Sequence, residues 1–286
     1  MLAAYELAMP EAQTTSVLFA SPHSGRDYPA SFLRRSILDQ QTIRSSEDAF
    51  VDLLFDCAPR FGSPLLAARS PRAYIDFNRS AEELDPALIE DVRSTGHNPR
   101  VSSGLGVVPR VVANGRAIYR GKLSRREADQ RIREHWYPYH QALDTLLKNT
   151  VRHFDEAILV DCHSMPHEAL ENVVHPKGIR PDIVLGDRFG AAAGGAVVDR
   201  IEAAFAAAGL SVIRNAPFAG AFSAQRYGRP SRGQHVIQVE IDRSLYMDEA
   251  RIRPNANFKS FRQLIEGIVA EITAIGREDA TPLAAE

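Results

Sequence analysis

The segment AILVDCHSMP, residues 157–166, ends an apolar run with an aspartate, a cysteine and a histidine before a proline stops it. A second segment, SVLFASPHSG at residues 16–25, has the same order of apolar run, short polar stretch and His-Ser pair. Short apolar runs bounded by turn-forming residues indicate buried β-strands. The sequence therefore predicts two strands, far apart in the chain, that deliver His23 and His163 at their ends.

Further short apolar runs alternate with longer segments that have helical spacing or capping signals. The runs lie at 64–68, 73–77, 182–186, 210–214 and 235–241. The helical segments lie at 45–62, 123–149, 191–208 and 256–276. Strands that alternate with helices predict an α/β fold with a mixed or mostly parallel sheet. Ligands bind such sheets at the carboxyl ends of the strands, where we expect the two histidines to lie.

The overall composition is that of an ordinary globular protein. The chain has 286 residues with 44% hydrophobic and 24% charged residues, enough for one large domain or two small ones. Its net charge of −2 argues against nucleic acid or a membrane as a partner, and no apolar run approaches the roughly 20 residues of a membrane span. Cys57 and Cys162 lie in apolar segments, and the N-terminus has no signal-peptide pattern, so we expect a cytoplasmic protein without disulfides. No pattern indicates an oligomeric state.

No clear linker divides the chain. The irregular, arginine-rich region 93–126 is the best candidate for a long functional excursion, and we expect residues 277–286 to form a loose tail. The basic run from Arg100 to Arg133 has two interpretations, an anion-binding face or a solvated helix surface, and the second is favoured.

The two histidines have two possible interpretations. Neutral imidazole suits zinc, and a catalytic zinc site has three protein ligands and an open position; alternatively, both are loop residues with ordinary hydrogen bonds. A third ligand could come from Asp27, Glu47 or Asp48, although Glu47 and Asp48 also suit the first turn of a helix. Neither HExxH nor CxxC is present.

Two more segments carry polar groups at predicted strand ends. In RAYIDFNRS (72–80), arginine and asparagine side chains suit a substrate carboxylate, while an internal pair between Asp76 and an arginine is the alternative. In HVIQVEI (235–241), Glu240 interrupts a buried strand. A buried carboxylate needs a partner, a metal or a catalytic task, and burial raises its pKa towards that of a general base. An ion pair with Arg243 or Arg229 is the alternative.

These fragments together resemble the N-formylglutamate amidohydrolase family. The matching pieces, in family order over residues 16–250, are SPHSG, EDAFVD, SPRAYIDFNRS, PYHQAL, VDCHSMP, DIVLGDRFG, NAPFAG, YGRP and HVIQVEIDRSLYMDE. The resemblance implies one amidohydrolase domain over residues 1–286, with the three-layer α/β/α fold and mixed, mostly parallel sheet of zinc exopeptidases of the carboxypeptidase type. It also implies hydrolysis of N-formyl-L-glutamate to formate and L-glutamate in histidine degradation, with one zinc ion or another divalent metal as cofactor.

The resemblance further implies a metal-ligand set. His23 and His163 correspond to the histidine ligands, and the acidic residue after SS corresponds to the third ligand, with Asp48 preferred and Glu47 as the substitute. Carboxypeptidase-like sites use a His-x-x-Glu unit, whereas Arg26 stands three residues after the first histidine here. The third ligand must therefore come from elsewhere in the chain.

The remaining roles follow from the same resemblance. Asn78 and Arg79, with Arg72, correspond to the side chains that bind the substrate carboxylates, and Glu240 corresponds to the general base. The small-molecule substrate is then an N-acyl amino acid. Three alternatives remain: a related metallo-hydrolase for another N-acyl amino acid or peptide, a metal-free binding protein for an acidic metabolite, and an anion- or nucleic-acid-binding module at 100–133.

Overall fold

The computed structural model describes residues 3–93, 98–171, 173, 178 and 180–277. A seven-stranded sheet forms its centre, with the strand order β1-β3-β2-β4-β7-β5-β6. The strands are β1 (Tyr5–Ala8), β2 (Val17–Ser21), β3 (Leu65–Ala68), β4 (Ala157–Met165), β5 (Ile183–Gly186), β6 (Val212–Arg214) and β7 (Gln234–Asp242). β3, β2, β4 and β7 run parallel, β1 is antiparallel to β3, and β5 is antiparallel to β7. The sheet is thus mixed and mostly parallel, as predicted.

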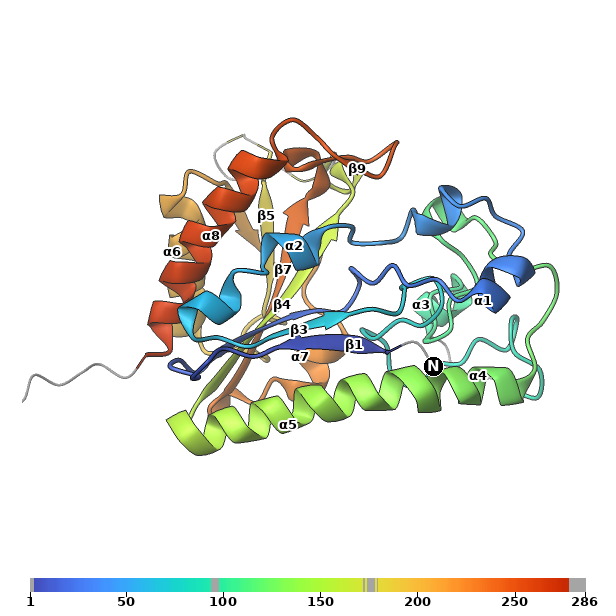
Figure 1. The fold of residues 1–286 in the computed structure, drawn as a ribbon, viewed down its shortest axis with the longest axis horizontal. Coiled ribbons are helices and arrows are strands. Elements are labelled where there is room, and N and C mark those ends of the chain that lie inside the picture. The colour runs from blue at the N-terminus through green and yellow to red at the C-terminus, as the bar shows by residue number, and fades with distance from the viewer. Residues whose placement is uncertain (1–2, 94–97, 172, 174–177, 179, 278–286) are drawn as a thin grey trace, which may run out of the picture.

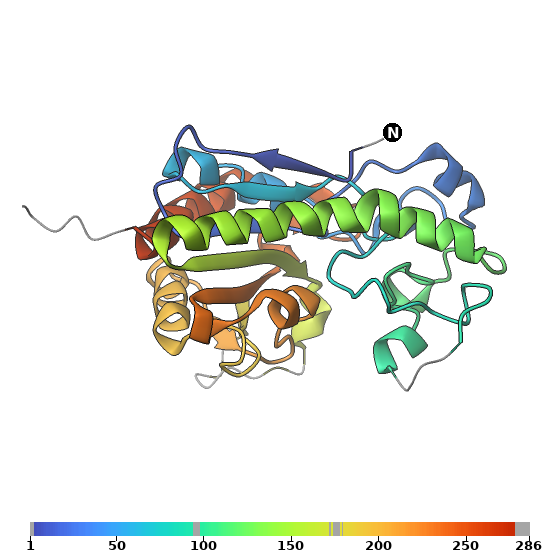
Figure 2. The same cartoon turned by 90° about the horizontal axis from the view of Figure 1, so that it is seen from below.

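Helices cover both faces of the sheet (Figures 1 and 2). They are α1 (Ala30–Arg35), α2 (Val51–Leu54), α3 (Pro99–Ser102), α4 (Arg125–Arg131), α5 (Tyr137–Phe154), α6 (Gly195–Ala207), α7 (Phe222–Tyr227) and α8 (Phe258–Ile275). One apolar core joins the sheet to α2, α6 and α8, and a second joins the opposite face to α5. The two short strands β8 (Met247–Asp248) and β9 (Arg253–Pro254) pair with each other. Among the described residues, no helix is long and apolar enough to cross a membrane.

The alternation of side chains along β4 explains how one strand can serve both cores and the site. Ile158, Val160 and Cys162 point into the core under α2, α6 and α8. Leu159 lies in the other core, and the next positions on its face are Asp161 and His163. Cys162 and His163 therefore lie on opposite faces, and one face becomes polar towards its carboxyl end.

Some predicted elements were wrong. Residues 73–77 form buried turns and not a strand, because the N–H groups of Tyr74 and Ile75 both donate locally to the Pro71 carbonyl. The helix predicted over 45–62 is reduced to α2 and a 3₁₀ turn (Ala58–Phe61), since Phe50 just before α2 has a left-handed backbone with φ of 68°. In both segments the apolar spacing correctly predicted that the residues are buried, but it did not predict their backbone conformation. The edge strand β1 was not predicted.

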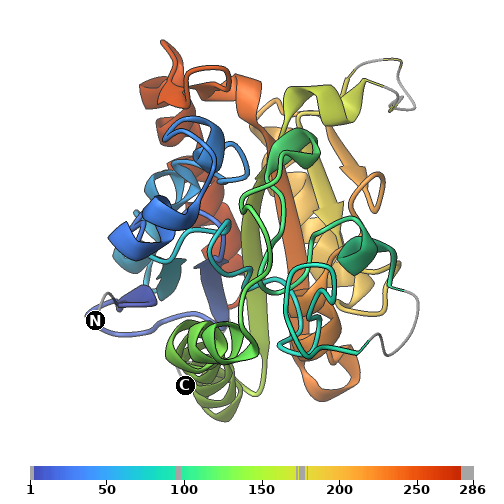
Figure 3. The same cartoon turned by 90° about the vertical axis from the view of Figure 1, so that its right-hand side faces the viewer.

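The described part of the predicted excursion, residues 98–126, contributes no strand to the sheet. It contains α3 and a 3₁₀ turn (Ala113–Gly115), and Figure 3 shows it, in teal to green, in front of the sheet. The Asn98 side chain caps α3 by accepting from the backbone N–H groups of Arg100 and Val101. Residues 278–286 of the predicted tail lie outside the described residues.

Two side chains from α5 and the helical turn before it make hydrogen bonds to the backbone of residues 72–80. The Trp136 indole N–H donates to the Arg79 carbonyl at 2.9 Å, and His140 Nε2 lies 2.9 Å from the Phe77 carbonyl. A carbonyl can only accept, so Nε2 carries a proton, and Nδ1 accepts from the Tyr227 hydroxyl at 2.8 Å. His140 is therefore a neutral, buried clamp on the backbone that flanks Asn78.

This clamp predicts a pH-dependent contribution to stability. Burial lowers the pKa of His140 from 6.5 to about 4, so the unfolded chain binds the proton first as the pH falls. Stability is then lost between pH 6.5 and pH 4. Relative to His140→Gln, which keeps one donor and one acceptor, the wild type should lose about 2–3 kcal/mol of unfolding free energy over this range.

Chemical denaturation at pH 7 and pH 4.5 measures the difference. His153→Gln, at an exposed position of the same helix, is the matched control, and its unfolding free energy should stay close to that of the wild type because the side chain is exposed. A gap between wild type and His140→Gln that stays constant with pH would contradict the buried neutral imidazole.

Candidate metal and substrate site

The register between β4 and β7 assembles the centre of the site. The two strands are parallel, with His163 directly beside Glu240 and Asp161 directly beside Gln238. His23 follows β2, which pairs with the other edge of β4. The carboxyl ends of three neighbouring strands therefore bring these side chains to one edge of the sheet, as the sequence predicted.

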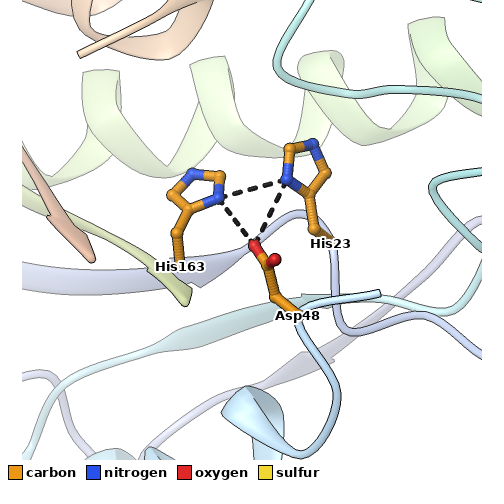
Figure 4. Close-up of side chains that lie close together, drawn as sticks. All are labelled: His23, Asp48 and His163. Atoms are coloured by element: carbon orange, nitrogen blue, oxygen red, sulfur yellow. Dashed lines mark hydrogen bonds and ion pairs between the residues drawn. The ribbon is translucent and has the colours of Figure 1, made fainter. Parts of the chain in front are cut away.

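His23, Asp48 and His163 meet at this edge with their side chains pointing at one another (Figure 4). The two Nδ1 atoms are 3.1 Å apart. Asp48 Oδ2 lies 3.0 Å from Nδ1 of His163 and 3.4 Å from Nδ1 of His23. All three residues are almost fully buried, with exposed fractions of 2%, 1% and 2%.

A carboxylate lies at the other ring nitrogen of each histidine. His23 Nε2 is 2.8 Å from Asp76 Oδ1. His163 Nε2 is 3.2 Å from Asp161 Oδ2 and 3.2 Å from the amide nitrogen of Asn78. Among the described residues, Asp161 Oδ2 makes no hydrogen bond and is buried, so it is an acceptor that lacks a donor. A proton on Nε2 of His163 would satisfy it, and loss of the Nδ1 proton would then present the Nδ1 lone pair to a cation at the centre.

Charged neighbours shift the pKa values of Asp48 and His163 strongly. Burial by itself raises the pKa of Asp48, but hydrogen bonds from His163 and His23 hold that pKa well below 3.8. Burial likewise lowers the pKa of His163, yet the carboxylate of Asp161 outweighs it and raises that pKa well above 6.5. Arg243 adds a further cation, with Nη2 2.9 Å from Asp48 Oδ1. Asp48 is therefore a carboxylate at neutral pH.

Glu47, the substitute for Asp48, lies in a different set of contacts. Its carboxylate makes two bonds of 2.9 Å to the Arg44 guanidinium and accepts from the Tyr28 hydroxyl at 2.7 Å. Arg26, which stands three residues after His23, pairs with Asp52. The geometry thus brings Asp48, and not Glu47, to the two histidines.

Glu240 is buried beside this group and lines the same cavity. It is 7% exposed, and its Oε1 accepts from Gln238 Nε2 at 2.8 Å. Burial raises the pKa of Glu240 from 4.5 to about 7. Neither alternative pairing is present: Arg243 bonds to Asp48 and Ser164, and Arg229 bonds to backbone carbonyls. A carboxyl with this pKa can accept and release a proton near neutral pH.

The cavity above these residues has a volume of about 570 Å³. Arg72, Asn78 and Arg79 all line it. Arg72 Nε donates to Asp76 Oδ2 at 3.1 Å, which is the internal ion pair considered as the alternative for this segment. Arg79 donates to carbonyl oxygens, with Nε 3.0 Å from that of Leu105. Residues 98–126 contribute further lining, among them Arg100 and Val111.

Sequence reasoning missed three residues of the site. Asp76 was considered as an arginine partner, but it also holds His23. Gln238 links Glu240 to the Asn78 amide, and Arg243 holds Asp48. Gln238 had a usable signal, because polar residues at alternate positions of an apolar strand lie on one face. The contacts of Asp76 and Arg243 depend on tertiary packing and had no such signal.

Sequence comparisons place the chain among known proteins. A family model described as N-formylglutamate amidohydrolase matches residues 15–247. The N-formylglutamate deformylase of Pseudomonas aeruginosa is 30% identical over 270 residues, which cover 92% of this chain and 94% of that protein. The N-formylglutamate deformylase of Pseudomonas putida is 27% identical over 237 residues, or 82% of each.

Structural comparisons agree with these matches. The crystal structure of N-formylglutamate amidohydrolase from Ralstonia eutropha superposes with a TM-score of 0.89 at 33% identity, over 96% of this chain and 99% of that one. A gene product from Agrobacterium tumefaciens has a TM-score of 0.62 at 16% identity over 96% of each chain, and shares the fold. With matches over most of its length, this chain belongs to the N-formylglutamate amidohydrolase family.

Proposed function

We propose that this chain, acting as one amidohydrolase domain, is a zinc-dependent enzyme that hydrolyses N-formyl-L-glutamate to formate and L-glutamate. The observation that carries the proposal is the buried group of His23, Asp48 and His163 beside Glu240, at the base of an arginine-lined cavity. The names of the Pseudomonas and Ralstonia relatives support the same substrate.

The donor set fits a divalent cation. Tetrahedral zinc with bonds of about 2.0–2.1 Å places neighbouring ligand atoms about 3.4 Å apart. The three donor atoms here are separated by 3.0–3.4 Å. The carboxylates of Asp76 and Asp161 at the opposite ring nitrogens are the outer partners that metal-bound histidines usually have. Two nitrogens and one carboxylate oxygen suit zinc, and other divalent transition metals are the alternative.

The chemistry divides between the cation and the protein. A bound zinc ion lowers the pKa of a water and polarises a carbonyl oxygen. Glu240 takes a proton from the attacking water as the oxygen–carbon bond forms, and delivers it to the amine nitrogen as the formamide carbon–nitrogen bond breaks. Its pKa of about 7 suits both transfers. The hydrogen bond from Gln238 and the register between β4 and β7 hold the Glu240 carboxyl at the cavity wall.

Arg72, Asn78 and Arg79 hold the substrate in this proposal. Asn78 donates to Gln238 Oε1 at 3.3 Å and accepts from the Ser223 N–H at 2.9 Å, so its position is fixed next to the reacting groups. Orientation of a formamide against a fixed water and base removes much of the entropic cost of the reaction. The proposal also places the enzyme in the cytoplasm and in histidine degradation; the buried free thiols of Cys57 and Cys162 support a reducing compartment.

The ligand assignment predicts which acidic residue controls metal content. Asp48→Asn should lower zinc affinity at least tenfold, because a neutral amide replaces the one anionic donor. Glu47→Gln, a neighbouring change of the same kind, should retain about one zinc per chain, since Glu47 bonds to Arg44 and Tyr28. Elemental analysis after dialysis against zinc buffers measures both. Loss of zinc from Glu47→Gln alone would contradict the assignment.

The base assignment predicts a defect in chemistry without metal loss. Glu240→Gln should lower kcat for formate release by about 10²–10⁴ while zinc content stays unchanged, because the amide cannot accept a proton. Glu156→Gln, at the opposite end of the same strands, is the matched control and should retain activity within a few-fold. Full activity of zinc-loaded Glu240→Gln would show that another group is the base.

A further inference from the structure

Four arginines line the cavity, and they fall into two classes. Arg72 pairs with Asp76, and Arg243 pairs with Asp48. Arg79 and Arg100 have no carboxylate partner among the residues that the structure describes. The cavity therefore presents two positive charges that the protein does not neutralise, and an anionic ligand would do so.

These two arginines are tied to one backbone unit. The Leu105 carbonyl accepts from Arg79 Nε at 3.0 Å, and the Leu105 N–H donates to the Arg100 carbonyl at 2.9 Å. The Asn98 side chain fixes the Arg100 backbone from the other side, with its oxygen 3.0 Å from the Arg100 nitrogen. Burial lowers the pKa of Arg79, and the positive charge of Arg100 lowers it further although Asp76 opposes both. The two cations thus lie close enough to repel each other.

Arg79 and Arg100 lie at different depths in the cavity. Arg79 is 6% exposed and follows Asn78, which contacts the His163 ring. Arg100 is exposed at the cavity wall formed by residues 98–126. In N-formylglutamate the α-carboxylate is attached to the carbon that bears the formamide nitrogen, whereas the γ-carboxylate is separated from that carbon by two methylene groups. A substrate with its formamide at the base of the cavity therefore offers one carboxylate deep and one near the wall.

We infer that Arg100 binds the side-chain carboxylate of the substrate while Arg79 binds the α-carboxylate, so that Arg100 makes the enzyme selective for acidic N-formyl amino acids. This inference rests on the proposed function and adds the residue that selects among substrates. It gives region 93–126 a role through its described part, because α3 and the Leu105 backbone carry Arg100 to the cavity. The ordered backbone at Arg100 reduces the loss of entropy when the ion pair forms.

Substrate pairs that differ in one charge test the inference. N-formyl-L-glutamate and N-formyl-L-glutamine have nearly the same shape, and the wild type should favour the acid. Arg100→Gln should lower kcat/KM for N-formyl-L-glutamate about tenfold to a hundredfold, mainly through KM, with little change for N-formyl-L-glutamine. Arg100→Lys should recover part of the preference, since it restores the charge but not the planar fork. Arg120→Gln, an exposed arginine of the same region outside the cavity lining, should behave as wild type.

Competitive inhibition by L-glutamate and L-glutamine gives a second readout that does not depend on the chemical step. The ratio of the two inhibition constants should approach one in zinc-loaded Arg100→Gln. An acid-to-amide preference that Arg100→Gln leaves unchanged in both assays overturns the assignment of Arg100 alone. A wild-type enzyme that releases formate from neither substrate, or favours the glutamine compound, contradicts the proposed function and this inference with it.

Discussion

Two imidazole nitrogens that face each other across 3.1 Å in a buried site impose the main constraint on this molecule. Two lone pairs at this distance repel unless a proton or a cation lies between them. The carboxylates of Asp76 and Asp161 hold protons on the outer nitrogens, so a cation that replaces the inner protons would meet both Nδ1 lone pairs and Asp48. A dication between these groups would neutralise charge that is otherwise costly to bury.

The sheet provides the rigidity that such a charge cluster needs. β4 pairs along its whole length with β7 and over residues 158–161 with β2, so His163, Glu240 and Gln238 are placed by backbone register and not by flexible loops. The turn that carries Asn78 is fixed from α5 by His140 and from the preceding π-helical turn (Ile132–Trp136) by Trp136. Residues 98–126, by contrast, line the wall of the cavity and contribute no strand to the sheet. In the proposed mechanism the sheet positions the reacting groups, and Arg100 of residues 98–126 would select among substrates.

Much of this could be predicted from the sequence, for physical reasons that differ between residues. His23, His163 and Glu240 stand at or near the ends of strands, and a parallel sheet collects such ends at one edge, so their meeting follows from topology. The residue pattern alone left Asp48 and Glu47 open, because the directions of neighbouring side chains in a turn have no clear sequence signature; only the family resemblance favoured Asp48. The prediction of a strand at 73–77 was wrong because residues buried in a packed loop have the same apolar pattern as residues buried in a sheet. The bonds of Arg243 to Asp48 and of Asp76 to His23 join distant segments and depend on packing.

We propose that one metal ion binds between Nδ1 of His23, Nδ1 of His163 and a carboxylate oxygen of Asp48. Anomalous diffraction from crystals grown with zinc, measured on both sides of the zinc absorption edge, tests it most directly. We expect a single strong peak about 2.0–2.2 Å from these three atoms, with Asp76 and Asp161 on the opposite ring nitrogens. A peak elsewhere, a peak at Glu47, or no peak in crystals of active enzyme would contradict it.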